Sequence, residues 1–336
     1  MSFIDKLWYS PTWYHWPVLV LLAPLSLVFW VLSATRRLAF KKGIKKSSAV
    51  TAPVIVVGNI SVGGNGKTPV VVYLAKRLRQ EGYHPGVLSR GYGAQGDVSY
   101  PHTVSAACTA QQVGDEPVLM RQHINCPLVI DPIRARGANK LVTDHKCDVI
   151  ICDDGLQHYA LQRDIEIIVM DGQRLCGNGY LLPSGPLREG KWRLSTADFV
   201  IKNGGVASNG EYLMALESGR LVNVSHPNKS LSIHDLKQEV TAIAGIGNPE
   251  RFFTLLTKKG VKLKSTKSFV DHHSFTVKDI PEGTVLMTEK DAVKCRSFAH
   301  KDCWYLPVNA HLPQQFDMKL LQQVKQILND KKRYSK

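Results

Sequence analysis

The hydrophobic residues between positions 54 and 171 alternate between short apolar runs and longer segments with helical spacing. Short, continuously apolar runs are typical of strands that are buried on both faces of a parallel sheet. Strands that alternate with helices at this spacing predict a doubly wound, mostly parallel α/β sheet. The expected strands cover residues 54–57, 85–91, 128–130, 148–154 and 165–171, and the expected helices cover 70–81, 116–123 and 133–144.

A glycine- and proline-rich stretch, residues 171–191, interrupts this pattern. The later segments with strand or helix character are 198–204, 240–260 and 284–294. We therefore expect a first domain over residues 36–170 and a second, smaller α/β domain over 171–313 that closes a cleft. The last helix, 314–330, places apolar residues on one face and is expected to join the first domain.

The N-terminal segment 16–32 reads WPVLVLLAPLSLVFWVL and carries no charge. As a helix it spans roughly 25 Å, which is marginal for a hydrocarbon core of ~30 Å. Six lysines and arginines follow it between positions 36 and 46. A buried core helix and a cleaved signal peptide are the alternatives, although no clean cleavage site follows the apolar run. We expect residues 1–35 to associate with a membrane, with the bulk of the protein on its cytoplasmic side.

Composition narrows the class of protein. The 336 residues are 44% hydrophobic and 21% charged, as in globular proteins. The net charge of +15 predicts an acidic partner, such as nucleic acid, an anionic membrane surface or a phosphorylated substrate. No zinc finger, ribonucleoprotein-type aromatic motif or compact basic helix occurs, so we do not expect nucleic-acid binding. The seven cysteines are scattered without a C-x-x-C pair, which argues against a disulfide framework or a zinc site.

Residues 61–68, SVGGNGKT, match the nucleotide-binding pattern G-x-x-x-x-G-K-[ST] at every position except the first. An apolar strand precedes them and a helix follows, which makes a simple glycine-rich turn the weaker interpretation. Glycines let backbone N–H groups approach phosphates, and the helix N-terminus adds partial positive charge. We expect Lys67 to bind the β- and γ-phosphates and Thr68 to ligate Mg²⁺. The expected nucleotide-binding residues are Ser61, Val62, Gly63, Gly64, Asn65, Gly66, Lys67 and Thr68.

Two aspartates, Asp153 and Asp154, end the apolar run VIICDD. Adjacent carboxylates at the end of a strand repel each other unless a cation lies nearby. With the phosphate-binding loop upstream, Mg²⁺ coordination is a better interpretation than a solvated turn. The sequence thus predicts that the chain binds a nucleoside triphosphate together with Mg²⁺.

Three further motifs concern the acceptor of the phosphate. In VGDEP, Asp115 is either a helix N-cap or a general base near the γ-phosphate. In GPLRE, Arg188 and Glu189 lie in a glycine-rich loop, where an arginine can neutralise charge on a transferred phosphoryl group. In DHHSF, residues 271–273 are either a structural group or part of the D-H-H triplet of some phosphoesterases.

Taken together, these motifs resemble the tetraacyldisaccharide 4′-kinase family. The resemblance covers roughly residues 10 to 310, and its motifs are specific in combination, whereas the phosphate loop alone is shared by many NTPases. They are SVGGNGKTP, SRGYG, VGDEP, DDGLQH, GPLRE, DHHSF and TEKDAVK, in this order behind an apolar N-terminus.

The resemblance implies transfer of the γ-phosphate of ATP to the 4′-hydroxyl of a tetraacylated disaccharide 1-phosphate, forming lipid IVA. It implies a membrane-associated enzyme at the cytoplasmic face of the bacterial inner membrane, and no obligate protein partner. The anionic acylated substrate and the membrane surface would account for the basic charge. The residues that match the family's catalytic positions are Asp115, His272, Asp271, Lys67 and Arg188, and those expected to hold Mg²⁺ are Thr68, Asp153, Asp154 and Glu189.

Two rival functions remain without the resemblance. A GTPase switch needs a guanine-reading N-K-x-D motif, and the nearest text, TEKD at 288–291, has the wrong spacing. A membrane-tethered ATPase that drives a protein partner would hydrolyse ATP without lipid. The residues alone predict a membrane-associated P-loop kinase or ATPase.

Overall fold

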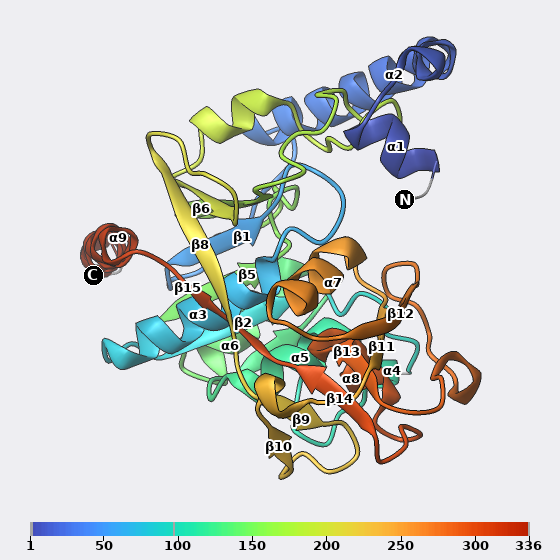
Figure 1. Ribbon diagram of the computed structural model, residues 1–336. Helices are drawn as coiled ribbons and strands as arrows, with labels where there is room; N and C mark the ends of the chain where they lie inside the picture. Colours follow the sequence, from blue (N-terminus) through green and yellow to red (C-terminus); the bar gives the residue numbers. More distant parts are fainter. Residues whose placement is uncertain (1–2, 97, 335–336) are drawn as a thin grey trace.

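The computed structural model describes residues 3–96 and 98–334, and its strands form two sheets (Figure 1). The larger sheet has nine strands. In spatial order they are β15 (Val308–His311), β8 (Glu211–Ser218), β7 (Phe199–Asn203), β6 (Ile165–Asp171), β1 (Val54–Gly58), β5 (Val149–Asp153), β2 (Pro85–Ser89), β4 (Leu128–Ile130) and β3 (His102–Thr103). Strands β8 to β4 run parallel, whereas β15 and β3 add antiparallel edges. The mostly parallel α/β sheet expected from the sequence is confirmed.

The second sheet has six strands and is also mixed. In spatial order they are β10 (Ser230–Leu231), β9 (Leu221–Asn223), β14 (Cys303–Leu306), β13 (Val285–Thr288), β11 (Val240–Ala244) and β12 (Leu263–Ser268). Strands β14 to β12 are parallel, and β9 and β10 are antiparallel additions. This is the smaller α/β unit that the sequence predicts.

The helices cover both sheets and extend beyond them. They are α1 (Phe3–Tyr9), η1 (Trp13–His15), α2 (Trp16–Lys41), α3 (Lys67–Gln80), α4 (Ala110–Val113), α5 (Asp115–His123), α6 (Arg134–Thr143), η2 (Lys191–Ser195), η3 (Ile233–Asp235), α7 (Pro249–Lys258), η4 (Val277–Asp279), α8 (Glu289–Cys295) and α9 (Gln314–Tyr334).

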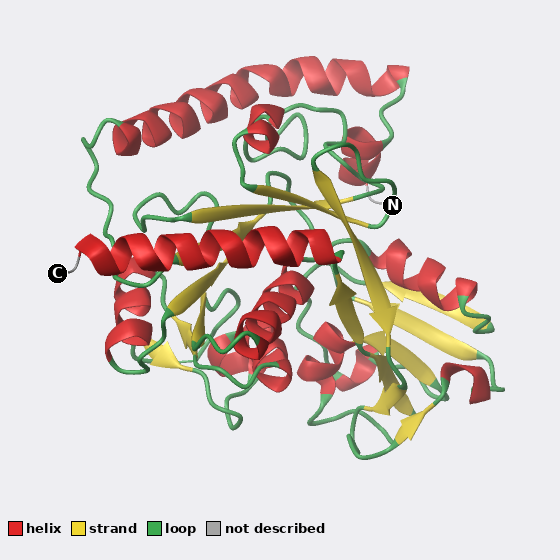
Figure 2. Ribbon diagram, turned by 90° about the vertical axis from the view of Figure 1, so that its left-hand side faces the viewer, coloured by secondary structure: helices red, strands yellow, loops and turns green. Residues whose placement is uncertain are grey.

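Strand β1 shows how the large sheet builds two cores, because successive side chains of a strand point to opposite faces. Ile55 and Val57 join a cluster with apolar residues of α3, α5 and α9, whereas Val54 and Val56 join a cluster with α6. Figure 2 shows α9 lying across one face of the sheet. Phe316 of α9 is fully buried there, and its ring centroid lies 5.1 Å from that of Phe199.

The arrangement of strands differs from the expected domain boundary at residue 171. β7 and β8 follow this residue and β15 precedes residue 313, yet all three belong to the first sheet. The loop after Asp171 therefore leaves the first sheet and returns to it. The second sheet begins only at β9, so the chain crosses between the sheets along β8 and β15, which pair with each other.

Helix α2 is long and apolar enough to cross a membrane, and it extends six residues beyond the expected limit at residue 35. In both ribbon views it lies apart from the sheets at one end of the molecule (Figures 1 and 2). Its contacts with the body are spread along its length: the Ser26 hydroxyl lies 2.8 Å from that of Ser184, Arg37 stacks on Trp192, and Phe40 contacts Tyr159. Most of its apolar side chains are exposed.

Replacing Phe316 with alanine should lower the free energy of unfolding by about 3–5 kcal/mol, because it leaves a cavity between α9 and the sheet. Chemical denaturation followed by circular dichroism measures this loss. Met318, 64% exposed on the same helix, provides the control, and Met318→Ala should change stability by less than about 0.5 kcal/mol. Equal losses in the two variants would contradict the packing described for α9.

Candidate active site

The phosphate loop, residues 61–68, joins β1 to α3 as the sequence predicts. Gly63 and Gly66 have φ values of 104° and 93°, a region that favours glycine. Helix α3 begins at Lys67, so the loop leads directly into the helix N-terminus. Asn65 holds the loop closed, because its amide donates to the Ser61 hydroxyl at 3.0 Å. The result is a backbone concavity of the kind that binds phosphate.

The two aspartates at the end of β5 lie beside this loop but in different environments. Asp153 is 1% exposed, whereas Asp154 has a φ of 47° and a more accessible side chain. Lys67 Nζ lies 3.2 Å from Asp154 Oδ1, and Arg188 Nη1 lies 3.5 Å from the same oxygen. Burial raises the pKa of Asp154, but these two cations outweigh it and the pKa is lowered.

Asp153 has the donor chemistry expected of a Mg²⁺ ligand. Its Oδ1 is buried and accepts no hydrogen bond from the described residues. Burial and the charges of Glu116 and Asp154 raise its pKa to about 7. No group of three or more His, Cys, Asp or Glu side chains suited to a metal occurs within 3–96 and 98–334. Mg²⁺ at nucleotide sites is usually held by one or two protein carboxylates, together with phosphates and water.

On the other side of the cavity, Asp115 and His272 form a hydrogen-bonded pair. Asp115 begins α5, is 6% exposed and accepts from the Glu116 backbone N–H at 2.9 Å. His272 follows β12, and its Nδ1 lies 3.1 Å from Asp115 Oδ2 and 3.2 Å from Oδ1. Asp115 and His272 are more than 150 residues apart in the sequence. Their contact connects the part of the chain that holds the first sheet with the part that holds the second.

The electrostatics keep Asp115 ionised. Burial raises its pKa, but the hydrogen bond from His272 and the charges of Lys290 and Lys294 outweigh burial and lower the pKa to about 2. The same hydrogen bond raises the pKa of His272, whereas burial and the charge of Lys290 act in the opposite direction. His272 has a φ of 59°, which is strained for a residue other than glycine. Such strain is frequent at functional sites.

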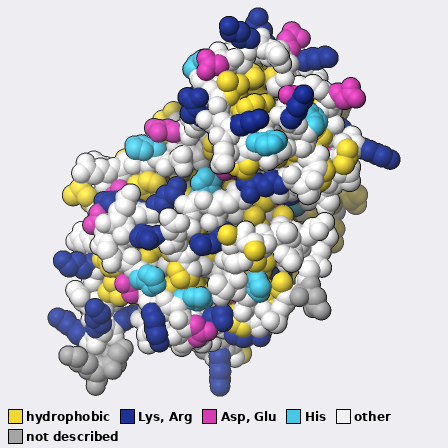
Figure 3. Space-filling view, turned by 90° about the horizontal axis from the view of Figure 1, so that it is seen from below, with side chains coloured by type: hydrophobic (Ala, Val, Ile, Leu, Met, Phe, Trp, Pro, Cys, Tyr) yellow, Lys and Arg dark blue, Asp and Glu magenta, His cyan; other side chains and the backbone are white. Residues whose placement is uncertain are grey.

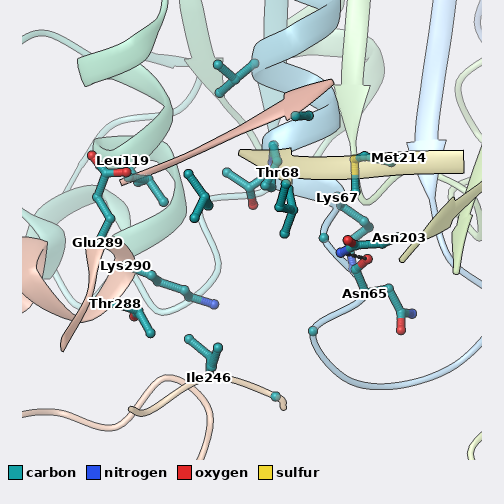
Figure 4. Close-up of a pocket in the computed structure, with 18 of the residues that line it drawn as sticks. Asn65, Lys67, Thr68, Leu119, Asn203, Met214, Ile246, Thr288, Glu289 and Lys290 are labelled. Atoms are coloured by element: carbon teal, nitrogen blue, oxygen red, sulfur yellow. Dashed lines mark hydrogen bonds between the residues drawn. The ribbon is translucent and has the colours of Figure 1, made fainter. Parts of the chain in front are cut away.

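A cavity of about 960 Å³ separates the phosphate loop from this pair. Lys67, Thr68, Asp153 and Asp154 line it from the first sheet, and His272 lines it from the second. Figure 4 shows Lys67 and Thr68 on one side and Lys290 pointing into the cavity from the other. The site therefore places a phosphate cradle opposite a carboxylate–histidine pair, with space for a nucleotide and part of an acceptor between them.

Comparison with known proteins agrees with this geometry. The sequence model described as tetraacyldisaccharide-1-P 4′-kinase matches residues 18–325. The chain belongs to this kinase family. Among its relatives, the tetraacyldisaccharide 4′-kinase of Pseudoalteromonas atlantica is 59% identical over 304 residues, covering 90% of this chain and 99% of the relative. That of Shewanella frigidimarina is 50% identical over 333 residues, covering 98% and 97%.

A solved structure shares the fold over nearly the whole chain. The crystal structure of LpxK from Aquifex aeolicus, described as an "apo" form in complex with ATP, superposes with a TM-score of 0.74. It is 28% identical and covers 93% of this chain and 99% of its own. The fold expected from the family resemblance is thus confirmed by a solved member of the tetraacyldisaccharide-1-P 4′-kinase family.

The structure brings most of the predicted site residues together. Four of them do not line the cavity. They are Ser61 and Val62 at the start of the phosphate loop, Asp115, which is hydrogen-bonded to the cavity-lining His272, and Glu189, whose neighbour Arg188 does line it. Glu189 accepts from the Gln157 amide at 2.8 Å and pairs with Arg193 at 2.7 Å. Asp271 lines the cavity, and its Oδ1 accepts from the His272 backbone N–H at 3.0 Å.

The sequence does not predict the roles of Asn203, Lys290 and Lys294 at this site. Asn203 ends β7, is buried and donates from Nδ2 to the Asn65 carbonyl at 3.0 Å, so it supports the phosphate loop from a neighbouring strand. Its place at the carboxyl end of a parallel strand was the available signal. Lys290 and Lys294 contact the Asp115 region, and the motif TEKDAVK by itself indicates no role for either lysine.

Replacing Asn203 with alanine should weaken ATP binding by about tenfold, because a buried carbonyl left without its donor costs about 1–3 kcal/mol. Isothermal calorimetry with ATP measures the change in Kd. Asn139, exposed on α6, offers a matched control, and Asn139→Ala should bind ATP as the parent chain does. Unchanged affinity in the Asn203 variant would contradict a supporting role for this contact.

Proposed function

We propose that this chain transfers the γ-phosphate of ATP to the 4′-hydroxyl of tetraacyldisaccharide 1-phosphate, forming lipid IVA in lipid A biosynthesis. The observation that carries the proposal is that His272, which lines the same cavity as the phosphate loop, is hydrogen-bonded to the Asp115 carboxylate. A hydroxyl acceptor needs a group that orients it and takes its proton, whereas a simple nucleotide switch does not. The family membership names the acceptor.

The nucleotide is bound in this proposal by the loop of residues 61–68 and by the N-terminus of α3. Lys67 binds the β- and γ-phosphates once ATP draws it from Asp154, and Arg188 lies close enough to the same carboxylate to share the phosphate charge. Thr68 and Asp153 would hold Mg²⁺, with Asp154 beside them. When bound, Mg²⁺ neutralises charge on the phosphate oxygens. We leave Glu189 out of this metal site because its carboxylate binds Arg193 and Gln157.

Asp115 accepts the proton of the sugar hydroxyl in this mechanism. A pKa near 2 makes it a weak base, but phosphoryl transfer passes through a loose transition state in which the hydroxyl becomes acidic late. Orientation of the hydroxyl is then the main contribution, and an ionised carboxylate provides it at every physiological pH. His272 holds the carboxylate in place through Nδ1, and Asp271 supports His272.

The lipid acceptor and helix α2 suggest where the enzyme works. Because contacts with the protein body occur at Ser26, Arg37 and Phe40, we propose that α2 lies in the plane of the membrane interface rather than across the bilayer. The basic residues that follow it favour the cytoplasmic face of the bacterial inner membrane. Figure 3 shows Lys and Arg spread over the face away from α2, without one continuous stripe of the kind that tracks nucleic acid.

A switch or motor that acts on a protein partner is not favoured. The family is one of kinases with an alcohol acceptor, and TEKD lies at the start of α8 with Lys290 bound to carboxylates, where it does not form a guanine-reading motif. The proposed chemistry needs ATP, Mg²⁺, an anionic acylated disaccharide and a membrane surface, and no obligate protein partner.

Replacing Asp115 with asparagine should lower kcat by about 10²–10⁴-fold with little change in ATP affinity, because only the proton acceptor is lost. Lys67→Ala should lower both kcat and ATP affinity, since it removes a phosphate contact. The assay measures label from [γ-³²P]ATP in the lipid product, and calorimetry measures ATP binding. An Asp115→Asn variant with full activity would exclude the base assignment, and ATP hydrolysis without lipid labelling would exclude the kinase function.

Replacing Leu21, Leu25, Val28 and Leu32 with glutamine should release the protein from membranes. These side chains are 54–77% exposed, so the change removes apolar surface without opening a core. Flotation with vesicles containing anionic lipid measures the bound fraction, which should fall by about tenfold or more. Glutamines at Val206 and Val277, which are exposed and lie outside α2 in the sequence, form the control. Undiminished flotation of the α2 variant would refute membrane binding through this helix.

A further inference from the structure

The motif TEKDAVK places Lys290 in the first turn of α8, next to the catalytic pair. α8 follows β13 of the second sheet and packs against α5 of the first. Lys290 Nζ lies 2.9 Å from Glu116 Oε1 and 3.3 Å from Asp271 Oδ1. The same nitrogen lies 3.5 Å from His272 Nε2 and 4.0 Å from Asp115 Oδ2. The Lys290 ammonium therefore lies within 4.0 Å of both members of the pair, Asp115 and His272, and of Glu116 and Asp271 beside them.

Lys290 is kept protonated in this position. Burial lowers its pKa, but Glu116, Asp115 and Asp271 outweigh burial and raise it. An ammonium has three N–H donors and no acceptor. Lys290 can thus only donate toward His272 Nε2, and the 3.5 Å contact is favourable when this nitrogen offers a lone pair.

This contact favours one tautomer of His272. With Nε2 as acceptor, the ring proton of the neutral imidazole lies on Nδ1 and points to the Asp115 carboxylate, which can only accept. In the other tautomer, an Nε2 hydrogen would face the ammonium, and the Nδ1 lone pair would face the carboxylate. Asp271 Oδ1, at 3.9 Å from Nε2, is too distant to stabilise that hydrogen.

We propose that Lys290 is a positioning residue for phosphoryl transfer: it keeps Nε2 of His272 unprotonated, so that Nδ1–H donates to Asp115, and it ties α5 to α8 through Glu116. The inference rests on the proposed function of Asp115 as the group that receives the hydroxyl proton. Held in this way, Asp115 keeps a fixed direction toward the acceptor, and His272 does not compete for the same proton.

Lys294, four residues further along the chain, contacts different groups. Lys294 Nζ lies 3.0 Å from Asp291 Oδ1 and 3.8 Å from Asp115 Oδ2, and no contact with His272 is present among the described atoms. It adds positive charge near the carboxylate but cannot select the tautomer. The groups that face the pair are Lys290 and Lys294 of α8, Glu116 of α5, Asp271 beside His272, and Tyr92, whose ring centroid lies 5.0 Å from that of His272.

Substitution of Lys290 tests the proposal kinetically. Lys290→Met should lower kcat by about 10²-fold while the KM for ATP changes by less than about threefold, because the orientation of the base is lost and the phosphate loop is untouched. Lys290→Arg keeps the charge and the donors and should recover a large part of kcat. Arg296→Ala removes a different α8–α5 hydrogen bond, to Gln122 at 3.2 Å, and should leave kcat unchanged. An equal loss in the Arg296 variant would reduce Lys290 to a general interface contact and overturn the proposal.

Nitrogen-15 NMR of histidine-labelled full-length protein tests the tautomer directly, with the His272 signal assigned by its loss in His272→Gln. In the parent chain at pH 8, Nδ1 should be protonated and Nε2 unprotonated. In Lys290→Met, the pKa of His272 should rise and Nε2 should gain a proton near neutral pH, because a facing cation has been removed. An unchanged tautomer and pKa would overturn the proposal. This readout needs no turnover, so it stays informative even if Asp115→Asn is active and the proposed base role fails.

Discussion

The hydrogen bond between Asp115 and His272 is the constraint on which the rest of the site depends, because its two partners belong to different sheets. Asp115 is fixed by the start of α5, which packs under the large sheet, and His272 by the strained turn after β12. The distance between phosphate loop and base is therefore a property of how the two sheets are joined.

The charges around this bond are balanced rather than uniformly basic. Asp115, Glu116 and Asp271 face Lys290 and Lys294 within a few ångströms, in a region where most of these side chains are at least three-quarters covered. Buried ion pairs contribute little to stability after desolvation, but they penalise any arrangement that leaves a charge unpaired. The cluster therefore specifies one closed geometry of α5 against α8. The net charge of +15 is carried elsewhere on the surface.

Local chemistry was readable from the sequence because its determinants are contiguous. The conformation of residues 61–68 is set by their own glycines and by the helix that follows, so eight residues suffice to predict a phosphate cradle. Adjacent residues can point to different partners: the Arg188 side chain contacts Asp154, whereas that of Glu189 contacts Arg193. The membership of β8 and β15 in the first sheet was equally hidden, because their pairing depends on where the second sheet is inserted between them.

The role of Lys290 could not be predicted for the same reason, since it follows from contacts with α5 that no short motif encodes.

Helix α2, although distant in the sequence from the residues after β5, contacts them in the structure. Phe40 at the end of α2 contacts Tyr159. Burial and the charges of Arg134 and Arg36 lower the pKa of His158 to about 4. His158 and Tyr159 lie a few residues after the aspartate pair at the end of β5. Helix α2 therefore ends beside the loop that leads to the phosphate site.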